Sequence, residues 1–185
     1  MKSISLLGIF LLLLYSGVGL SQAASVAVCD GSGFPGAQNI EVPLELTIEK
    51  GEHVAAIQLD ISYDPNLLTF KEVAAGQAAL DSKKQVTGST PSEGTIRTII
   101  YGLNQNSLED GIIATISFDI KSSASAGVIP LSASNATASD PDANFLSLNT
   151  AAGSITITDA KGKEKKSWPT KTHKRLPICF IALLY

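Results

Sequence analysis

Residues 53–70 read HVAAIQLDISYDPNLLTF, and this stretch decides the fold of the chain. From Ile57 to Tyr63, apolar side chains alternate with polar ones, which predicts a β-strand with one buried and one solvent-facing side. Asp64-Pro65-Asn66 then predicts a turn, because proline cannot donate to a sheet and Asp and Asn side chains bond to nearby backbone. Leu67–Phe70 returns the chain to the core, so we expect the corner of a β-sandwich.

Similar apolar patterns recur through residues 25–160, with turn residues every 8–12 positions. The pattern predicts about eight or nine short strands and no long amphipathic helix, and residues 71–80 are expected to hold a strand followed by a loop or a short helical turn. This organisation is typical of an all-β sandwich. The segments concerned are 25–29, 40–50, 57–63, 71–80, 85–90, 95–101, 112–120, 128–138, 145–148 and 154–158.

The alternation also predicts which side of each strand is buried. In residues 40–50, the aliphatic side chains face inward and Glu41, Glu45 and Glu49 face water, while Pro43 indicates an edge or bulged strand. The inward set predicted for residues 112–120 is Ile112, Ala114, Ile116, Phe118 and Ile120. In residues 95–101 the charged Arg97 must face outward, which turns Ile99 and Tyr101 outward and Ile96, Thr98 and Ile100 inward.

Three segments resemble the cohesin family. Residues 57–68 are similar to its F-x-L-x-Y-D-P-x-x-L segment, with Tyr63-Asp64-Pro65 in place. Residues 111–118 (GIIATISF) look like its G-x-x-A-x-x-x-F strand, and residues 152–157 (AGSITI) look like its closing G-x-I-x-I strand. The resemblance covers residues 26–158. It implies a two-sheet antiparallel β-sandwich of jelly-roll type with about nine strands, an architecture similar to that of some carbohydrate-binding modules.

The two ends of the sequence differ from the predicted domain. Lys2, an apolar run over residues 4–20 and the small residues Ser21 and Ala23 predict a secretory signal peptide over residues 1–24, with an uncleaved anchor as the alternative. Residues 161–185 are expected to form a disordered basic tail ending in ICFIALLY, which at eight residues is too short to span a membrane as a helix. A weak surface-association element and an out-of-frame end replacing a longer natural C-terminus are the alternatives. The domain itself is expected over residues 25–160, in an extracellular or cell-surface location.

Charge separates these regions and excludes one class of partner. Residues 25–160 hold 16 acidic and 6 basic residues, a net charge of −10, whereas residues 161–185 hold 7 basic residues and 1 acidic residue, a net charge of +6. An acidic domain of this kind argues against nucleic acid, which is bound by basic surfaces. A membrane is expected to be contacted only through an uncleaved signal or the tail.

Cysteine and histidine content gives little support to catalysis or metal binding. Cys29 and Cys179 are far apart in the sequence, so two free thiols are expected, with a bridge between them as the alternative. A Ser-His-Asp triad would depend on His53 alone, which is expected to be a polar residue at a strand edge. We therefore predict no enzyme activity, no cofactor and no catalytic metal.

Residues 140–144 and 135–137 carry two weaker motifs. Asp140, Asp142 and Asn144 alternate as in a Ca²⁺ loop, but the Gly and Glu that an EF-hand requires are missing, so a plain turn is expected, with a structural Ca²⁺ as the alternative. Asn135-Ala136-Thr137 matches a glycosylation sequon, which is informative only in a host that glycosylates secreted proteins.

The remaining function is binding. An outer sheet face that combines apolar and polar side chains is typical of a protein-interaction surface, although an ordinary sheet exterior is an equal alternative. In the cohesin family this face binds dockerin modules, which are Ca²⁺-loaded helical pairs on partner enzymes, and the central strand often presents Asn and Asp where this chain has Ala and Gln. The predicted partner-binding residues are Ala56, Gln58, Asp60, Ser62, Arg97, Ile99 and Tyr101.

Two other functions stay open at this point. The link to polysaccharide degradation belongs to the dockerin-binding function that the resemblance implies. The first of the other functions is a carbohydrate-binding module of the same sandwich type, but a flat sugar platform needs exposed aromatic residues. Before Trp168 the predicted domain has no Trp, and its tyrosines are Tyr63 and Tyr101. The second is a structural surface domain without a separate ligand.

Overall fold

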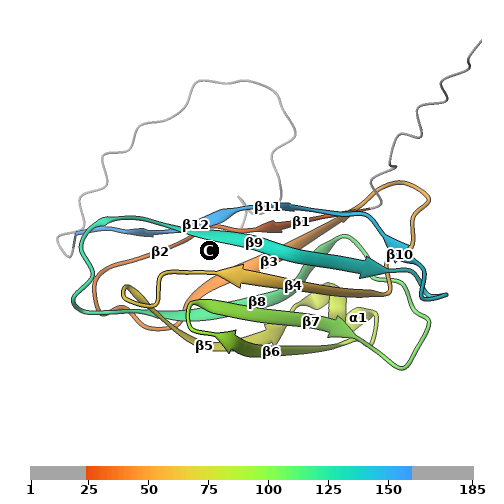
Figure 1. The fold of residues 1–185 in the computed structure, drawn as a ribbon, viewed down its shortest axis with the longest axis horizontal. Coiled ribbons are helices and arrows are strands. Elements are labelled where there is room, and N and C mark those ends of the chain that lie inside the picture. The colour runs from red at the N-terminus through yellow and green to blue at the C-terminus, as the bar shows by residue number, and fades with distance from the viewer. Residues whose placement is uncertain (1–23, 160–185) are drawn as a thin grey trace, which may run out of the picture.

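The computed structural model describes residues 24–159, which form two β-sheets packed face to face (Figure 1). One sheet has the order β11 (Leu148–Ala151), β1 (Ala24–Val28), β3 (Ile40–Ile48), β8 (Gly111–Ile120) and β5 (Leu68–Ala75). The other has the order β2 (Gly31–Gly33), β12 (Gly153–Ile157), β9 (Gly127–Ser139), β4 (Ala56–Ser62), β7 (Thr95–Tyr101) and β6 (Gln85–Ser92), with β10 (Phe145–Leu146) paired to β9.

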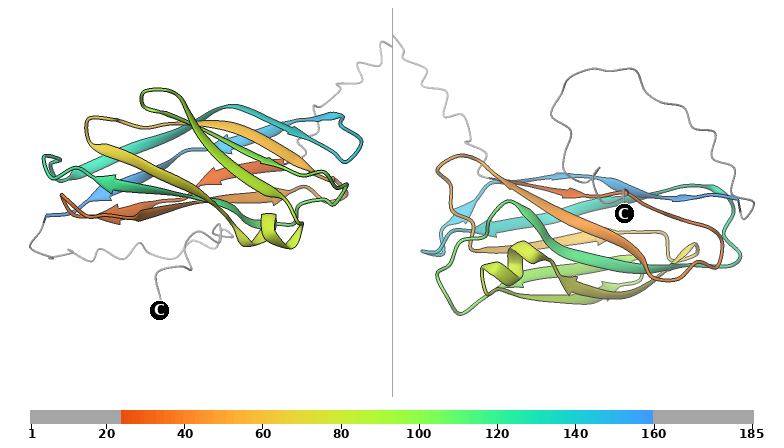
Figure 2. Two further views of the ribbon diagram at one scale, coloured as in Figure 1. Left: turned by 90° about the horizontal axis from the view of Figure 1, so that it is seen from below. Right: turned by 180° about the vertical axis from the view of Figure 1, so that it is seen from behind.

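The predicted all-β jelly-roll sandwich is confirmed. In Figure 1, β9, β4 and β7 cross the view side by side in front of β3 and β8. The view from behind in Figure 2 brings the sheet of β3 and β8 forward, with the short helix α1 (Gln77–Asp81) against β8. Strand pairs are antiparallel except for β1 with β11 and β2 with β12, which are parallel. Residues 24–159 hold twelve strands rather than about nine, because several are only two to five residues long.

The core lies between the sheets and is built from the inward side of each strand. Phe118 of β8 is fully buried, and its ring meets the ring of Tyr63 edge-on at 5.3 Å and that of Phe70 at 6.4 Å between centroids. Such aromatic contacts add to the free energy gained by burying the rings. The inward residues expected for β7, namely Ile96, Thr98 and Ile100, are all buried as predicted.

The turn after β4 forms as the sequence predicts. Asp64 Oδ1 accepts a hydrogen bond of 2.8 Å from the Asn66 backbone N–H, and the backbone carbonyl of Asp64 accepts bonds from the N–H groups of Leu67 and Leu68. The corner also depends on Gly94 in the hairpin between β6 and β7. Gly94 has φ +74°, and a Cβ there would lie 2.9 Å from the Tyr63 carbonyl oxygen, so only glycine fits without strain.

The inward set predicted for β8 is wrong at its start. Ile113, rather than Ile112, is fully buried, while Ile112 is only half-buried. The reason is a β-bulge: Leu44 of β3 pairs with Ala114, but the next residue, Glu45, pairs with Ile112, which leaves Ile113 without an opposite residue. A bulge of this kind shifts the alternation by one position.

One expectation for β3 is also wrong, since Glu45 is buried rather than facing water. Of the two alternatives that Pro43 indicated, the edge strand does not apply, because β3 lies between β1 and β8. The bulge inferred from Pro43 is present, between Leu44 and Glu45. Because Pro43 has no N–H, it sits in an interior strand only where the regular ladder is already interrupted.

Three smaller expectations are corrected by strand pairing. The loop expected at residues 30–36 contains β2, and the single strand expected at residues 145–148 is split between β10 and β11, which lie in different sheets. The turn expected at residues 90–94 is shorter, since β6 continues to Ser92. Cys29 is buried and is not a free thiol, so the expectation of unpaired cysteines is wrong for this residue.

Several predictions fall on residues that the structure does not describe. The predicted signal peptide, apart from Ala24 at the start of β1, and the tail at residues 161–185 with Cys179 lie outside the described residues. Across residues 24–159, no helix is long and apolar enough to cross a membrane.

We expect Phe118→Ala to lower the free energy of unfolding by about 3–5 kcal/mol, because it leaves a cavity beside the rings of Tyr63 and Phe70. The matched control is Phe145→Ala, which removes a ring that is 89% exposed and should change the free energy by less than about 0.5 kcal/mol. Urea denaturation followed by circular dichroism measures both. Equal losses in the two variants would contradict the assignment of the core.

Candidate functional site

The outward side of β9, β4, β7 and β6 forms one continuous surface, which we call the β4 face. On β4, the side chains at every second position from Ala56 to Ser62 point outward, and the register pairs Gln58 with Ile99 and Asp60 with Arg97. The structure therefore brings together all seven residues predicted to bind a partner: Ala56, Gln58, Asp60, Ser62, Arg97, Ile99 and Tyr101.

An ion pair lies at the centre of this face. Arg97 Nε donates to Asp60 Oδ1 at 2.7 Å and Arg97 Nη2 donates to Asp60 Oδ2 at 2.8 Å, which is the two-point geometry that guanidinium and carboxylate groups favour. Asn135 Nδ2 donates a third hydrogen bond, at 2.9 Å, to Asp60 Oδ2. The Asp60 side chain is only 4% exposed and that of Arg97 35% exposed, so the carboxylate is covered by its own donors.

These donors set the charge of Asp60. The hydrogen bond from Arg97 is the main reason that the pKa of Asp60 is lowered, and the bond from Asn135 lowers the pKa further, while burial opposes both. The same contact raises the pKa of Arg97. Asp60 is one of the predicted partner-binding residues, and both of its carboxylate oxygens already accept hydrogen bonds from Arg97 and Asn135, so its side chain offers a partner little free acceptor.

Asn135 reaches Asp60 because β9 bulges beside β4. Gln58 pairs with Thr137 but Asp60 pairs with Ser134, so an extra residue of β9 lies opposite this part of β4. Asn135 sits at the bulge with φ +48°, a conformation that Asn adopts more readily than most residues. The bulge therefore aims the amide across the strand boundary at the carboxylate.

Apart from this pair, the sheet of the β4 face carries no charge among the described residues. Of the residues in β2, β4, β6, β7, β9, β10 and β12, only Asp60 and Arg97 are charged, and they neutralise each other. The remaining outward side chains are mostly Ser, Thr, Gln and Asn. A net charge of −10 over residues 25–160 is thus carried entirely outside this surface.

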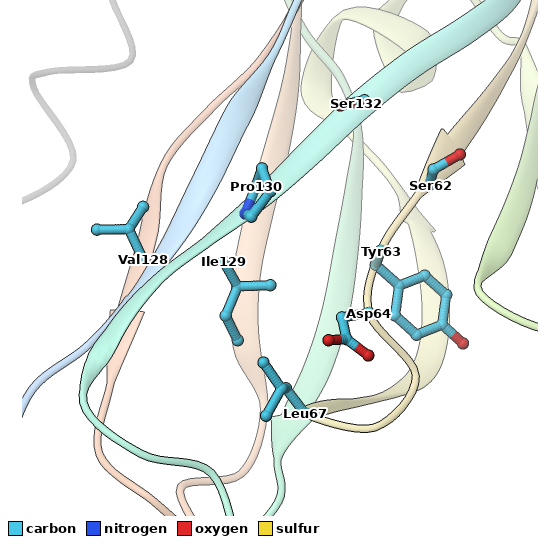
Figure 3. Close-up of a pocket in the computed structure, with 8 residues that line it drawn as sticks. All are labelled: Ser62, Tyr63, Asp64, Leu67, Val128, Ile129, Pro130 and Ser132. Atoms are coloured by element: carbon cyan, nitrogen blue, oxygen red, sulfur yellow. The ribbon is translucent and has the colours of Figure 1, made fainter.

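A hollow of about 360 Å³ opens where β4 ends, and we call it the Ser62 hollow. In Figure 3, Leu67 and Ile129 point toward each other between the turn and β9, and the ring of Tyr63 points away from β9. Burial raises the pKa of Tyr63, consistent with its packing on Phe118. The hollow is lined by Ser62, Tyr63, Asp64, Leu67, Val128, Ile129, Pro130 and Ser132.

A second hollow, of about 150 Å³, lies at the other end of β4, and we call it the Phe145 hollow. The small side chain of Ala56 leaves the space, and the exposed rings of Tyr101 and Phe145 stand at its margin. It is lined by Ala56, Ile57, Gln58, Ile99, Ile100, Tyr101, Thr137, Ala138, Ser139 and Phe145.

Sequence reasoning missed the contribution of β9 and β10 to this face. The pairing of β9 with β4 joins segments about 75 residues apart, and no local pattern predicts its register. The residues that β9 brings to the face include Pro130, Asn135 and Thr137. Phe145 offered a signal, because a large aromatic residue directly after the polar turn at residues 140–144 is placed to be exposed at a sheet end.

The other candidate chemistry gains no support from the geometry. His53 is exposed, and its Nδ1 lies 3.5 Å from Ser107 Oγ. Asp140 closes its own turn: its Oδ1 accepts from the backbone N–H groups of Asp142 and Asn144, and its Oδ2 accepts from Asn144 Nδ2. Within residues 24–159, no group of three or more His, Cys, Asp or Glu side chains is placed to hold a metal ion.

The chain is thus an all-β jelly-roll sandwich with a nearly neutral outer sheet face. The family model of the cohesin domain matches residues 25–157, and the chain therefore belongs to the cohesin family. Cohesins are non-catalytic protein-binding modules, so the prediction that the chain is not an enzyme is confirmed by its family.

Solved structures agree with this assignment. The chain is similar to the cohesin CaCohA2 of Clostridium acetobutylicum, with 25% identity, a TM-score of 0.63, and coverage of 74% of this chain and 92% of that one. The sixth cohesin of Acetivibrio cellulolyticus scaffoldin B, solved in complex with a Cel5 dockerin, gives 19% identity, a TM-score of 0.66, and coverage of 74% and 100%. A non-cellulosomal cohesin from the archaeon Archaeoglobus fulgidus gives 19% identity, a TM-score of 0.62, and coverage of 75% of this chain and 94% of that one. No curated protein matches the sequence.

We expect Asp60→Ala to lower the free energy of unfolding by about 1–3 kcal/mol, because it leaves Arg97 and Asn135 without their acceptor. The loss lies at the lower end of this range if water hydrates the Arg97 side chain, which is 35% exposed, once the carboxylate is removed. Asp142→Ala, at an exposed carboxyl beyond the end of β9, is the control and should change stability by less than about 0.5 kcal/mol. Urea denaturation at pH 7 measures both, and equal effects would contradict a structural role for the pair.

The lowered pKa of Asp60 also predicts how stability depends on pH. Because the folded state holds the carboxylate with a pKa below the ordinary value of 3.8, its contribution is complete above that value, declines as the pH falls below it, and is lost once the pH has passed the lowered pKa. We therefore expect the stability difference between the wild type and Asp60→Asn to be constant from pH 7 to pH 5 and to shrink below pH 4. Taking this difference removes the contributions of Asp119 and Asp140, whose pKa values are also lowered. A difference that grew on acidification would contradict the assignment.

Proposed function

We propose that this chain is an exported cohesin module that binds a dockerin-type protein through the β4 face, as part of an extracellular or cell-surface complex. The observation that carries the proposal is the β4 face itself, a flat surface whose only charges form a closed ion pair and whose two ends are hollowed. Support comes from membership of the cohesin family and from the solved cohesin–dockerin complex of a structural neighbour.

The distribution of exposed apolar residues favours this face over the rest of the described surface. The large hydrophobic side chains exposed among residues 24–159 are Phe34, Leu80, Tyr101, Leu103, Val128 and Phe145. Three of them line the two hollows of the β4 face, and Leu103 lies two residues beyond Tyr101. Apolar groups gathered on one polar surface are typical of a protein-binding site, in which aromatic residues supply much of the binding energy.

Location outside the cell and a link to polysaccharide degradation are part of the proposal. The predicted signal peptide supports export, and the family resemblance supports the link. Direct carbohydrate binding receives less support, because Tyr101 and Phe145 meet at one hollow rather than forming the aromatic strip that a sugar platform needs. We therefore expect the purified chain not to be retained on cellulose or chitin, and this measurement serves as the negative control.

We expect Tyr101→Ala to weaken capture of a dockerin by about tenfold or more, because it removes an exposed ring from the margin of the Phe145 hollow. Gln58→Arg, which places a charge in the lining of the Phe145 hollow, should have a similar effect. The mature chain is tested against a panel of dockerin modules by pull-down and calorimetry. The matched aromatic control is Phe34→Ala, whose ring is 54% exposed between β2 and β3, away from the face.

Two results would contradict the proposal in different ways. Unchanged affinity in both Tyr101→Ala and Gln58→Arg, with binding retained, would exclude the β4 face as the site. Failure of every dockerin in the panel to bind the folded wild type would exclude the proposed class of partner.

A further inference from the structure

Cys29 lies directly after β1, and its sulfur is already used. The residue is 4% exposed and is disulfide-bonded. The sequence contains two cysteines, Cys29 and Cys179. Within one chain, Cys179, which lies outside the described residues, is therefore the one residue that can pair with Cys29.

The side chain of Cys29 is on the outer side of its sheet rather than in the core. Val26 and Val28 of β1 are buried in the core. Cys29 continues the pairing of β1 with β3, since its N–H donates to the Pro43 carbonyl at 2.9 Å. Because side chains alternate along a strand, Cys29 follows Ala27 on the outward side. The apolar core therefore does not account for its burial.

Glu45 of β3 is buried on the same side. It stands between two leucines that are fully buried in the core, so its side chain points outward. Its neighbours in the adjacent strands are Ala27 and Ile112, which are themselves only half-buried, and Glu41 and Thr47 on the same side of β3 are exposed. Glu45 is nevertheless 4% exposed, so a local cover lies over this part of the sheet.

Charge indicates what forms the cover. A buried carboxylate needs a positive or hydrogen-bonding group beside it. Residues 25–160 carry a net charge of −10 and residues 161–185 a net charge of +6, so the tail is complementary to the domain. The basic residues nearest to Cys179 in the sequence are Lys174 and Arg175, five and four positions before it.

The tail is long enough to return to β1. A Cβ on Gly153 would lie 2.7 Å from the carbonyl oxygen of Cys29, so β12 begins beside Cys29. The chain from Gly153 to Asp159 extends about 20 Å away from this point at about 3.3 Å per residue. Twenty residues lead from Asp159 to Cys179, and such a segment reaches up to about 66 Å. The return therefore requires no change in the domain.

We propose that residues 160–185 fold back over the outer side of β1 and β3, held by a disulfide between Cys29 and Cys179 and by basic side chains beside Glu45. This side belongs to the sheet opposite the β4 face, so the tail leaves the proposed binding surface open. The inference relies on the proposed export but not on dockerin binding.

Closing the bond is an oxidation of two thiols. The two sulfurs lose two protons and two electrons and form one S–S bond. The acceptor is the disulfide of a thiol oxidoreductase in the oxidising compartment that an exported chain enters, and this disulfide is reduced to two thiols.

The bond is tested on the full chain, exported and purified without reductant. Digestion without reduction, followed by mass spectrometry, should yield the peptide of Cys29 linked to that of Cys179, and thiol titration of the denatured chain should find no free thiol. Two free thiols per chain, or a disulfide-linked dimer on a non-reducing gel, would overturn the inference while leaving dockerin capture to test the proposed function.

Cys179→Ser measures the effect of the bond without changing the described domain. We expect the Tm to fall by about 5–15 °C, because a disulfide that encloses nearly the whole domain restricts the unfolded chain. The matched control, Ser167→Ala, keeps both cysteines and should change the Tm by less than about 2 °C. Equal Tm values for wild type and Cys179→Ser would overturn the inference.

Carboxyl modification with a carbodiimide and an amine reports the cover over Glu45. In the wild type, Glu45 should be protected and the exposed Glu41 modified. In a triple variant that combines Cys179→Ser with Lys174→Glu and Arg175→Glu, modification of Glu45 should rise about fivefold or more, and that of Glu41 by less than about twofold. Glu45 protected equally in the two proteins would overturn the placement of the tail on this side of the sheet.

Discussion

The strict alternation of β4 is the constraint on which the rest of the structure depends. Its inward side chains, Ile57, Leu59 and Ile61, are buried between the sheets, and its outward positions form the middle of the β4 face. Because a shift of one residue would exchange the two sides of the strand, the register that buries the aliphatic residues also fixes the outer surface. Core stability and the geometry of the binding face are therefore set by the same seven residues.

Much of this could be predicted from residues 53–70 and the segments that share their pattern. The two-layer fold, the turn at Asp64 and the outward set on β4 and β7 follow from local alternation and turn chemistry, and the structure agrees with them. The burial of Glu45, the inward position of Ile113 and the covered state of Asp60 could not be predicted. Each depends on a bulge or a hydrogen bond between strands far apart in the sequence, which local patterns do not encode.

The burial of Asp60 changes what this residue contributes to the face. An unpaired carboxylate at the centre of a sheet would attract cations and basic partners, whereas one bound by Arg97 and Asn135 presents almost no net charge. Buried ion pairs contribute little to stability relative to apolar residues of similar size, so their value often lies in specificity. Here the pair keeps the middle of an acidic domain's flat surface neutral without exposing a large apolar patch, which would favour aggregation.

The bulge in β9 connects this electrostatic arrangement to the shape of the face. The extra residue opposite β4 places Asn135 over Asp60, and the ladder between the two strands changes register between Gln58 and Asp60. The Phe145 hollow involves β9 residues on one side of the bulge, Thr137–Ser139, and the Ser62 hollow involves those on the other, Val128–Ser132. A regular β9 would lose the Asn135 contact and place its outward residues differently along β4. The bulge thus adds the Asn135 hydrogen bond to the ion pair that Arg97 forms with Asp60, and it lies between the β9 residues that line the two hollows.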